Sequence, residues 1–396
     1  MNRVLQPADS QGEGGPRLTV GVPRETIPGE RRVALSPDVI RKLARNFRVL
    51  IESGAGEGSS FPDRFYQEAG AEIAPSAAAV YGQSDIVLKV QRPTPEEVTQ
   101  LRPGSLLIAL LSPLTRPELA VELAKHGVTA LSMDAIPRIT RAQSMDALSS
   151  MSTVAGYKAV LLGANALQKF FPLLMTAAGT IRPARVLVLG AGVAGLQAIA
   201  TARRLGAVVE AFDTRPVVKE QVQSLGATFV ELDVAHEEAQ DAGGYAKELA
   251  EEHIRREIEL IRDHAAKSDV VITTALIPGR PAPVLLPDET VQGMQPGSVI
   301  IDLAAEMGGN CTQTVPGETV VRNDVTIMGP LNLPSEMATH ASMMYAKNIT
   351  ALLDHLAPKG ELTLDMEDAI TRGVVITHNG EVLHGPTLAW MKEQVA

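Results

Sequence analysis

The sequence feature that most constrains the fold is a glycine-rich hexapeptide that directly follows an apolar segment. Val186–Leu189 predicts a buried strand, Gly-Ala-Gly-Val-Ala-Gly occupies positions 190–195, and a helical pattern comes next. In such a strand–turn–helix unit Gly190 permits a tight turn, Gly192 lets the backbone approach a pyrophosphate, and Gly195 lets helix and strand pack closely. The positive end of the helix stabilises the phosphate charge. If the glycines do more than form a turn, the expected contacts with a dinucleotide are Gly190, Ala191, Gly192, Val193, Ala194 and Gly195.

An acidic residue follows the next predicted strand and indicates which nucleotide is bound. Asp213 comes directly after Val208–Phe212. A carboxylate there accepts hydrogen bonds from the adenosine ribose hydroxyls and repels a 2′-phosphate, which favours NAD over NADP. Arg215 argues the other way, because an arginine near this point can accept that phosphate. Since the acid lies at the strand end itself, we expect Asp213, Thr214 and Arg215 to contact NAD.

Strands and helices alternate along most of the chain, which predicts an α/β protein with parallel sheets covered by helices on both faces. In the first half the expected strands are Leu18–Val22, Val49–Ser53, Ile86–Val90, Leu106–Leu110 and Thr129–Ser132. In the second half they are Arg185–Leu189, Val208–Phe212, Thr228–Glu231, Val270–Thr274, Ser298–Leu303 and Val325–Met328.

The length of the chain, 396 residues, exceeds one ordinary core and predicts two domains. A helical pattern over Leu148–Phe171 predicts a connecting helix. A last long helix, capped by Ser335, is expected to return to the first domain and make it discontinuous. The predicted domains are residues 1–147 with 338–396, and residues 148–337.

Composition excludes several classes of function. The formal net charge of -10 argues against a protein that binds nucleic acid. Cys311 is the single cysteine, so no internal disulfide or cysteine-based metal cluster is possible, and no histidine or carboxylate spacing predicts a metal site. No apolar run is long enough to span a bilayer, and the polar N-terminal segment does not resemble a signal peptide. We expect a cytoplasmic protein without a membrane span of its own.

Directional polar side chains gather in a segment between the two predicted domains. They are Arg138, Arg141, Gln143, Asp146 and Ser149. Ligands bind where domains meet, so this segment is a candidate binding loop. The residues alone leave open a second interpretation, a solvated loop that ends in a helix N-cap.

Two further segments lie at the ends of predicted strands in the second domain. Thr274, Ala275 and Leu276 form one of them, and Asn332 belongs to the other. Cofactors of parallel α/β sheets bind at the carboxyl ends of the strands, so we expect these residues to line the cofactor site. Turn formation explains the neighbouring glycines and prolines equally well.

Four stretches of sequence together resemble a known family. They are Gly-Val-Pro-Arg-Glu at 21–25, Arg-Arg-Val-Ala-Leu-Ser-Pro at 31–37, the segment 138–150, and Ile-Asp-Leu-Ala-Ala-Glu-Met-Gly-Gly-Asn at 301–310. The chain resembles the NAD(H)-binding alpha subunits of proton-translocating nicotinamide nucleotide transhydrogenases, in the superfamily that includes alanine dehydrogenases. The resemblance covers nearly the whole chain, and segment 138–150 is its most specific part. It implies two Rossmann-like, doubly wound parallel-sheet domains with an interdomain cleft.

The resemblance also implies roles for individual residues. In the resembled subunits the loop that matches segment 138–150 lies beside the nicotinamide ring. Arg138 and Ser149 are then expected to hold the carboxamide, Asp146 to orient Arg138 and the ribose, and Gln143 to reach toward the partner nucleotide. These four residues position the ring without activating it chemically.

A second implied feature is a mobile loop in the long segment between Asp233 and His264. Its centre contains Gly244 and Tyr245, which the resemblance places over the bound nucleotide. Closure of such a loop excludes water and fixes the geometry of the ring. The residues alone indicate only a loop that precedes an amphipathic helix over Lys247–His264.

Chemistry distinguishes the two relatives. Oxidation of an amino acid removes a proton as well as a hydride, so a dehydrogenase needs an acid–base group, commonly histidine. Hydride exchange between two nicotinamide rings needs only proximity and orientation. Alanine dehydrogenases carry that histidine just after the strand that matches Leu106–Leu110. This chain has Ser112 at or near that place, and none of its eight histidines stands out as a replacement. Arg32 and Lys89, which match substrate-carboxylate binders of the dehydrogenase, are retained, and Glu306 replaces a catalytic carboxylate.

We therefore expect an enzyme subunit that binds NAD(H) and passes a hydride to NADP+ on a separate NADP(H)-binding beta subunit. A membrane-spanning subunit would couple this exchange to proton translocation and hold the chain at the inner face of the cell membrane. The resemblance further implies a homodimer. The alternatives are a stand-alone NAD-dependent alanine dehydrogenase and a nucleotide-sensing module without turnover.

Overall fold

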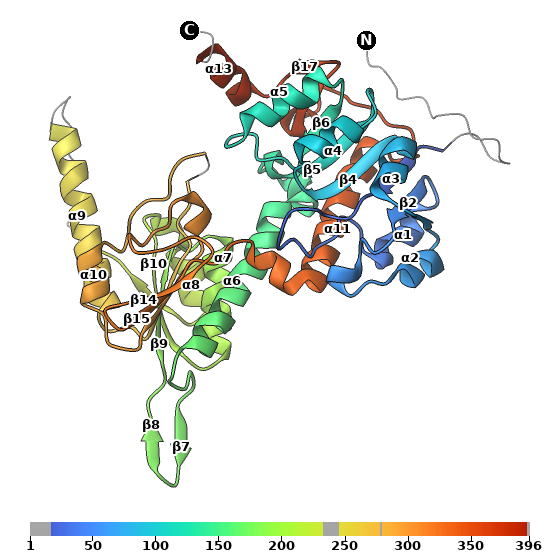
Figure 1. The fold of residues 1–396 in the computed structure, drawn as a ribbon. Coiled ribbons are helices and arrows are strands. Elements are labelled where there is room, and N and C mark those ends of the chain that lie inside the picture. The colour runs from blue at the N-terminus through green and yellow to red at the C-terminus, as the bar shows by residue number, and fades with distance from the viewer. Residues whose placement is uncertain (1–16, 233–244, 278, 394–396) are drawn as a thin grey trace. The chain divides into compact units, whose positions relative to one another are not determined.

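The computed structural model describes residues 17–232, 245–277 and 279–393. The chain divides into two compact units (Figure 1). Unit 1 comprises Met1–Met151 and Pro334–Ala396, and unit 2 comprises Ser152–Leu333. The first unit is thus discontinuous in sequence, because the C-terminal segment joins the N-terminal one.

Unit 1 is built on an eight-stranded sheet in the order β17-β16-β6-β5-β4-β1-β2-β3. Strands β1 to β6 are parallel, and their order is that of a Rossmann fold. β16 and β17 extend the sheet antiparallel beyond β6. The bounds of the strands are β1 Thr19–Val22, β2 Arg48–Glu52, β3 Glu72–Ala74, β4 Ile86–Gln91, β5 Leu106–Leu110, β6 Thr129–Ser132, β16 Val375–His378 and β17 Glu381–Val382.

Helices cover the unit 1 sheet, and the short ones start at prolines or polar caps. On one face Val87 and Leu107 pack with Leu123 of α5 in a buried apolar cluster. The long helix α11 joins this unit from the C-terminal segment, and its buried Tyr345 hydroxyl donates to the carbonyl of Lys89 at 2.8 Å. The helices are α1 Pro37–Leu43, α2 Asp63–Ala69, α3 Ala77–Gln83, α4 Pro95–Gln100, α5 Pro117–Lys125, α11 Ala338–Leu356, α12 Ala369–Val374 and α13 Gly385–Glu393.

Unit 2 contains a seven-stranded sheet in the order β11-β10-β9-β12-β13-β15-β14. All pairs are parallel except β14 with β15, so the first six strands again follow the Rossmann order. The order reverses between β9 and β12, which is where open parallel sheets bind ligands. The bounds are β9 Arg185–Leu189, β10 Val208–Phe212, β11 Thr228–Val230, β12 Val270–Thr273, β13 Val299–Asp302, β14 Thr319–Arg322 and β15 Val325–Met328.

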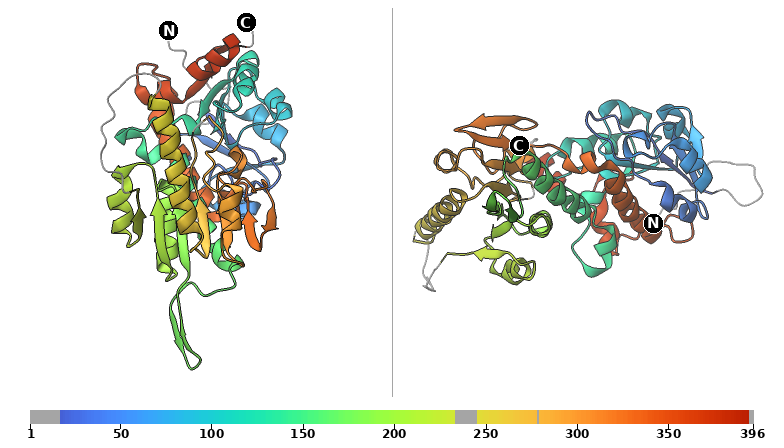
Figure 2. Two further views of the ribbon diagram at one scale, coloured as in Figure 1. Left: turned by 90° about the vertical axis from the view of Figure 1, so that its left-hand side faces the viewer. Right: turned by 90° about the horizontal axis from the view of Figure 1, so that it is seen from below.

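Alternate residues of β9 enter two different cores of unit 2, as expected for a strand buried on both faces. Val186 and Val188 pack with residues of α6, α7 and α8, whereas Leu187 and Leu189 pack with residues of α9 and α10. Figure 2 shows these helices in two further views. Their bounds are α6 Ala147–Ala166, α7 Val193–Arg204, α8 Lys219–Ser224, α9 Tyr245–Ala265 and α10 Asp288–Gln292.

The region after α6 differs from the sequence-based expectation. The predicted helix continues to Phe171, but α6 ends at Ala166. Leu167 and Phe171 follow a non-helical path into the buried core of unit 2, so tertiary packing overrides the local pattern. A two-stranded hairpin comes next, with β7 at Leu174–Thr176 and β8 at Gly179–Ile181, and it projects from the rest of unit 2 (Figures 1 and 2). A hairpin of three-residue strands carries too little periodicity to be predicted.

The predicted cap of the last helix is also wrong. A 3-10 turn, Leu333–Met337, precedes α11, whose N-cap is Met337 without a side-chain hydrogen bond. The hydroxyl of Ser335 instead donates to the carbonyl of Gly29 at 2.8 Å and accepts from the backbone N–H of Arg31 at 2.6 Å. Ser335 therefore joins the N-terminal and C-terminal segments of unit 1, a role that no local pattern indicates.

Two searches of the described residues concern membranes and metals. No described helix is both long and apolar enough to cross a membrane. No cluster of three or more histidine, cysteine or acidic side chains within the described ranges of the chain could hold a metal ion.

Candidate functional site

The glycine turn lies between β9 and α7 at the carboxyl edge of the unit 2 sheet. Gly190 has a φ of 97°, which favours glycine, and its N–H donates to the carbonyl of Phe212 at 2.8 Å. A Cβ placed on Gly195 would lie 1.8 Å from the carbonyl oxygen of Gly190, so no other residue fits there without rearrangement. Both glycines are therefore required by the close packing of strand, turn and helix.

Gly192 differs from its two neighbours because open space surrounds it. It is the N-cap of α7, and a Cβ placed on it would meet nothing within 4 Å. Helix α7 has 12 residues, and the N–H groups of its first turn have no partners within the helix. Val193 and Ala194 form that first turn. The combination of free space and a helix N-terminus suits an anionic group such as a pyrophosphate.

Asp213 ties the turn to β10 and also holds Arg215. Its carboxylate accepts from the backbone N–H of Ala191 at 2.7 Å and from the Arg215 guanidinium at 2.9 Å on both oxygens. Burial raises the pKa of this carboxyl, but the hydrogen bonds from Arg215 and Ala191 outweigh burial and lower the pKa below its usual value. The acid is therefore ionised at neutral pH. Arg215, which could accept a 2′-phosphate, is therefore hydrogen-bonded to Asp213, the acid that favours NAD. Thr214 between them is exposed.

Thr274, Ala275 and Leu276 follow β12 and lie next to the glycine turn. The Thr274 hydroxyl donates to the carbonyl of Gly190 at 3.1 Å. Leu276 is 51% exposed and follows β12 at the end of the sheet where a nucleotide would bind. The structure thus brings the turn, Asp213 and the Thr274 segment together.

Asn332 lies beyond the carboxyl end of β15. In the sheet, β13 separates β15 from β12, the strand that precedes the Thr274 segment. Its φ is 50°, in the left-handed region, and its backbone N–H donates to Glu306 at 3.1 Å.

Of the two residues predicted in the closing loop, Gly244 lies outside the described residues. Tyr245 is the first residue of α9, and its side chain likewise lies outside the described residues.

The four residues predicted to hold the nicotinamide lie in unit 1, around a 3-10 helix at Thr140–Met145 and the start of α6. Asp146 accepts from the backbone N–H of Ser149 at 2.9 Å and from its hydroxyl at 2.6 Å, as a helix N-cap does. Arg138 and Gln143 are exposed. Among the described residues the Arg138 guanidinium has no hydrogen bond or ion pair, so it is available to a ligand.

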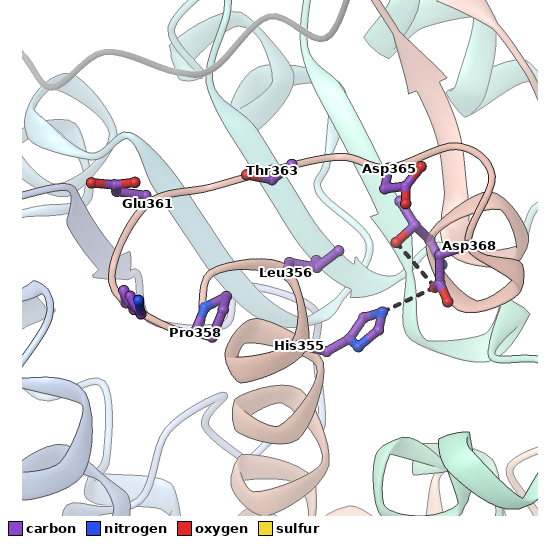
Figure 3. Close-up of a pocket in the computed structure, with 9 residues that line it drawn as sticks. His355, Leu356, Pro358, Glu361, Thr363, Asp365 and Asp368 are labelled. Carbon is purple, nitrogen blue, oxygen red and sulfur yellow. Dashed lines mark hydrogen bonds and ion pairs between the residues drawn. The ribbon is translucent and has the colours of Figure 1, made fainter.

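A pocket of about 390 Å³ lies in unit 1 between the end of α11 and α12 (Figure 3). Asp368 at its edge accepts from His355 at 3.0 Å and from Arg141 at 2.8 Å, and it also caps α12. The backbone hydrogen bond from Thr371 and these two side chains hold the pKa of Asp368 well below its usual value. None of the predicted site residues lines this pocket, and the ion pair between Arg141 and Asp368 links its edge to segment 138–150.

Lys89 and Arg32, which the resemblance matches to substrate-carboxylate binders of alanine dehydrogenase, lie buried in unit 1, and each has a carboxylate partner. Lys89 Nζ donates to Glu97 at 2.9 Å and lies 3.4 Å from a carboxylate oxygen of Glu25. Arg32 Nε donates to Glu30 at 2.8 Å. Burial raises the pKa of Glu30, but the hydrogen bonds and charge of Arg32 outweigh burial and lower it to about 2. Both cations therefore belong to buried ion pairs within the chain.

Ser112, which the resemblance places at or near the position of the dehydrogenase histidine, has a left-handed backbone, with a φ of 53°. Its N–H donates to Asp134 at 2.8 Å, and the N–H of Leu111 donates to the other oxygen of the same carboxylate at 3.2 Å. Asp134 thus fixes the loop after β5. A serine hydroxyl does not titrate near neutral pH, so no acid–base group is present at this position.

Comparison with known proteins decides the family. The model for the N-terminal domain of alanine dehydrogenase/PNT matches residues 21–155, and the model for the C-terminal domain matches residues 159–385. The chain belongs to the alanine dehydrogenase/PNT family.

Within the alanine dehydrogenase/PNT family, relatives named transhydrogenase are more similar in sequence than those named alanine dehydrogenase. A chain of Rhodospirillum rubrum, named as the first portion of NAD(P) transhydrogenase subunit alpha, is 49% identical over 93% of this chain and 98% of that one. NAD(P) transhydrogenase subunit alpha of Haemophilus influenzae is 46% identical over 92% and 71% of the two chains. The alanine dehydrogenase of Bacillus subtilis is 31% identical over 93% of each chain.

Solved structures of the alanine dehydrogenase/PNT family show the same ranking. A transhydrogenase structure from Sinorhizobium meliloti aligns with a TM-score of 0.84 at 44% identity, over 92% of this chain and 99% of that one. An L-alanine dehydrogenase aligns with a TM-score of 0.78 at 28% identity, over 95% and 99%. The expectation of an α/β protein with two Rossmann-like domains is confirmed.

Proposed function

We propose that this chain is the NAD(H)-binding subunit of a proton-translocating nicotinamide nucleotide transhydrogenase. The observation that carries the proposal is Ser112, which leaves a complete dinucleotide-binding turn without the acid–base group that amino-acid oxidation requires. Direct hydride transfer between two nicotinamide rings moves no proton at the reacting atoms and needs only close, oriented rings. The higher identity to relatives named transhydrogenase supports the same conclusion.

The residues at the carboxyl edge of the unit 2 sheet fit NAD(H), and no further group is needed to bind the pyrophosphate and the ribose. The free space at Gly192 and the N-terminus of α7 suit the pyrophosphate. The ionised Asp213 keeps acceptor capacity for ribose hydroxyls while it holds Arg215. Bound NAD(H) supplies the transferable hydride, and Thr274 and its neighbours bind and orient the dinucleotide.

The segment in unit 1 completes the proposal. From the resemblance, Arg138 and Ser149 hold the nicotinamide carboxamide, Asp146 orients Arg138 and the ribose, and Gln143 reaches toward the nucleotide of the partner. The exposed guanidinium of Arg138 and the exposed side chain of Gln143 support these roles, since both can reach a ligand. In this mechanism the chain contributes position and orientation, while the acceptor NADP+ is held by a beta subunit.

The assembly follows from the same proposal. A separate NADP(H)-binding subunit holds the second nucleotide, and a membrane-spanning subunit couples hydride transfer to proton translocation. This chain then lies on the cytoplasmic face of the membrane through those partners. The names of its transhydrogenase relatives, which are subunits, support an activity that needs partner chains.

The proposal predicts that NADH binds to the isolated chain without net transhydrogenation. Adding an NADP(H)-binding transhydrogenase component is expected to start hydride transfer, followed with an NAD analogue of distinct absorbance. Vigorous transhydrogenation by the isolated chain would contradict the proposal. NADH formation from L-alanine would instead support a dehydrogenase, and NADH binding without transfer to the supplied partner would support a sensing module.

We also propose that the chain forms a homodimer through the β7–β8 hairpin. A hairpin of two short strands is marginally stable in water by itself, so a covering surface is needed. Its apolar side chains are exposed in the single chain, with Met175 of β7 82% and Ile181 of β8 37% accessible. Exposed apolar groups gathered on a projecting element are typical of an interface, and a second copy of the chain can bury them reciprocally.

Substitution of Met175 by aspartate is therefore expected to convert the dimer to a monomer. Burial of the introduced carboxylate in an apolar interface is costly. Light scattering measures the result against the chain mass of 42.0 kDa. Val217→Asp is the matched control, because Val217 is 78% exposed but lies outside the hairpin. A Met175→Asp variant that stays dimeric would contradict this interface.

A further inference from the structure

Asn310, to which the sequence assigns no role, is fully buried and joins three segments at the carboxyl edge of the unit 2 sheet. Its Oδ1 accepts from the backbone N–H of Ala275 at 3.1 Å, and its Nδ2 donates to the carbonyls of Ala275 at 2.9 Å and Pro283 at 2.7 Å. Its backbone carbonyl accepts from the N–H groups of Leu285 and Leu286. The side-chain amide thus pairs with both polar groups of the Ala275 backbone.

Asp302 holds Asn310 in turn. One carboxylate oxygen of this fully buried residue accepts from the backbone N–H of Asn310 at 2.8 Å and from the hydroxyl of Thr314 at 2.7 Å. The other oxygen accepts from the hydroxyl of Thr273, the last residue of β12, at 2.8 Å. The carboxylate is therefore saturated by donors, and it leaves the orientation of Asn310 little freedom.

The Ala275 segment contacts the glycine turn directly. A Cβ placed on Gly190 would lie 2.6 Å from the Thr274 hydroxyl and 3.4 Å from the backbone nitrogen of Ala275. The Thr274 hydroxyl also donates to the carbonyl of Gly190. A shift of Ala275 is therefore transmitted through Thr274 to the glycine turn, where the pyrophosphate is proposed to bind.

We propose that Asn310 is a positioning residue of the cofactor site: it holds Ala275, and through Thr274 the glycine turn, in the geometry that binds NAD(H). Asn310 acts through the backbone of its neighbours and does not contact the nucleotide. The inference rests on the proposed binding of NAD(H) to this turn, and it adds the buried residue on which the affinity depends.

Substitution of Asn310 by alanine tests, before any nucleotide is added, whether this side chain holds the Ala275 segment in place. The amide proton of Ala275, which donates to the lost side chain, is expected to exchange faster with solvent. The amide of Leu286, which donates to the backbone carbonyl of the same residue, is expected to keep its protection. Faster exchange at Ala275 alone indicates local release of the segment, whereas faster exchange at both amides indicates loss of the fold.

The same variant is expected to bind NADH about tenfold more weakly, because two hydrogen bonds that pre-organise the segment are lost. The matched control is Thr290→Val, since the buried Thr290 hydroxyl has no hydrogen-bond partner among the described residues. That variant is expected to retain the wild-type affinity. Faster exchange at Ala275 with unchanged NADH affinity would overturn the inference. A wild-type chain that does not bind NADH would overturn the proposed function instead.

A second variant is used if Asn310→Ala also speeds the amide exchange of Leu286. Asn310→Asp keeps an oxygen that accepts from Ala275 but places the other oxygen against the carbonyls of Ala275 and Pro283. Burial and the neighbouring Asp302 raise the pKa of the introduced carboxyl, and its protonated form regains one donor. The loss of NADH affinity relative to wild type is therefore expected to shrink as the pH falls. A ratio of affinities that stays near one at every pH would overturn the inference.

Discussion

A Gly192→Ala variant is expected to keep the melting temperature of the wild-type chain while its affinity for NADH falls by at least about tenfold. The folded chain tolerates the methyl group, because a Cβ at this position meets nothing within 4 Å and the φ of Gly192 is −76°. The same free space is where the proposed pyrophosphate approaches the backbone. Calorimetric titration with NADH and a thermal melt measure the two quantities.

Gly195→Ala provides the contrast to this variant. Its Cβ would lie 1.8 Å from the carbonyl oxygen of Gly190, so the turn must move before the side chain fits. Both the melting temperature and the NADH affinity are expected to fall, by an amount on the order of 3 kcal/mol for stability. A Gly192→Ala chain that binds NADH as tightly as wild type would contradict the placement of the pyrophosphate at this turn.

Substitution of Asp213 by alanine is expected to weaken NADH binding about tenfold and to raise the preference for NADPH. Two effects act together, because the variant loses an acceptor for the ribose hydroxyls and releases the Arg215 guanidinium from its two hydrogen bonds. The freed guanidinium can then pair with a 2′-phosphate. Dissociation constants for NADH and NADPH, measured in parallel, give the preference directly.

The double variant Asp213→Ala with Arg215→Ala separates these effects. It is expected to bind NADH as weakly as the single variant but to lose the gain for NADPH. Glu231→Ala serves as control, because Glu231 pairs with Lys219 in an exposed ion pair of the same unit. An Asp213→Ala chain whose preference between the nucleotides stays that of wild type would contradict the role of this acid.

Much of the fold could be predicted because it arises from local patterns. Apolar segments separated by helical ones indicate parallel strands, and the predicted strand Val208–Phe212 agrees with β10 in both bounds. The glycine turn and Asp213 are predictable for the same reason, since strand, turn, helix and acid follow one another within a short stretch. Ser112 is informative only through the resemblance, which places it at or near a dehydrogenase histidine, because a serine hydroxyl does not titrate near neutral pH.

Features that depend on distant parts of the chain could not be predicted. Ser335 looks like a helix cap, yet its hydroxyl bonds the backbone around Gly29 and Arg31, some three hundred positions earlier in the sequence. The β7–β8 hairpin escapes prediction, since its short strands carry little periodicity of their own. Asn310 ends one of the stretches that carry the resemblance, but its role gives no sequence signal, because its side-chain partners are backbone groups, which every residue possesses.

The sequence by itself therefore determined the Rossmann-like alternation, the dinucleotide turn and the acid beyond β10, all of which arise from residues close together in the chain. Only the tertiary structure decided which groups those residues engage. It pairs Arg215 with Asp213, sets Thr274 against Gly190, and anchors Ala275 on Asn310. The physical reason is that a hydrogen bond depends on distance and direction in space, which separation along the sequence does not specify.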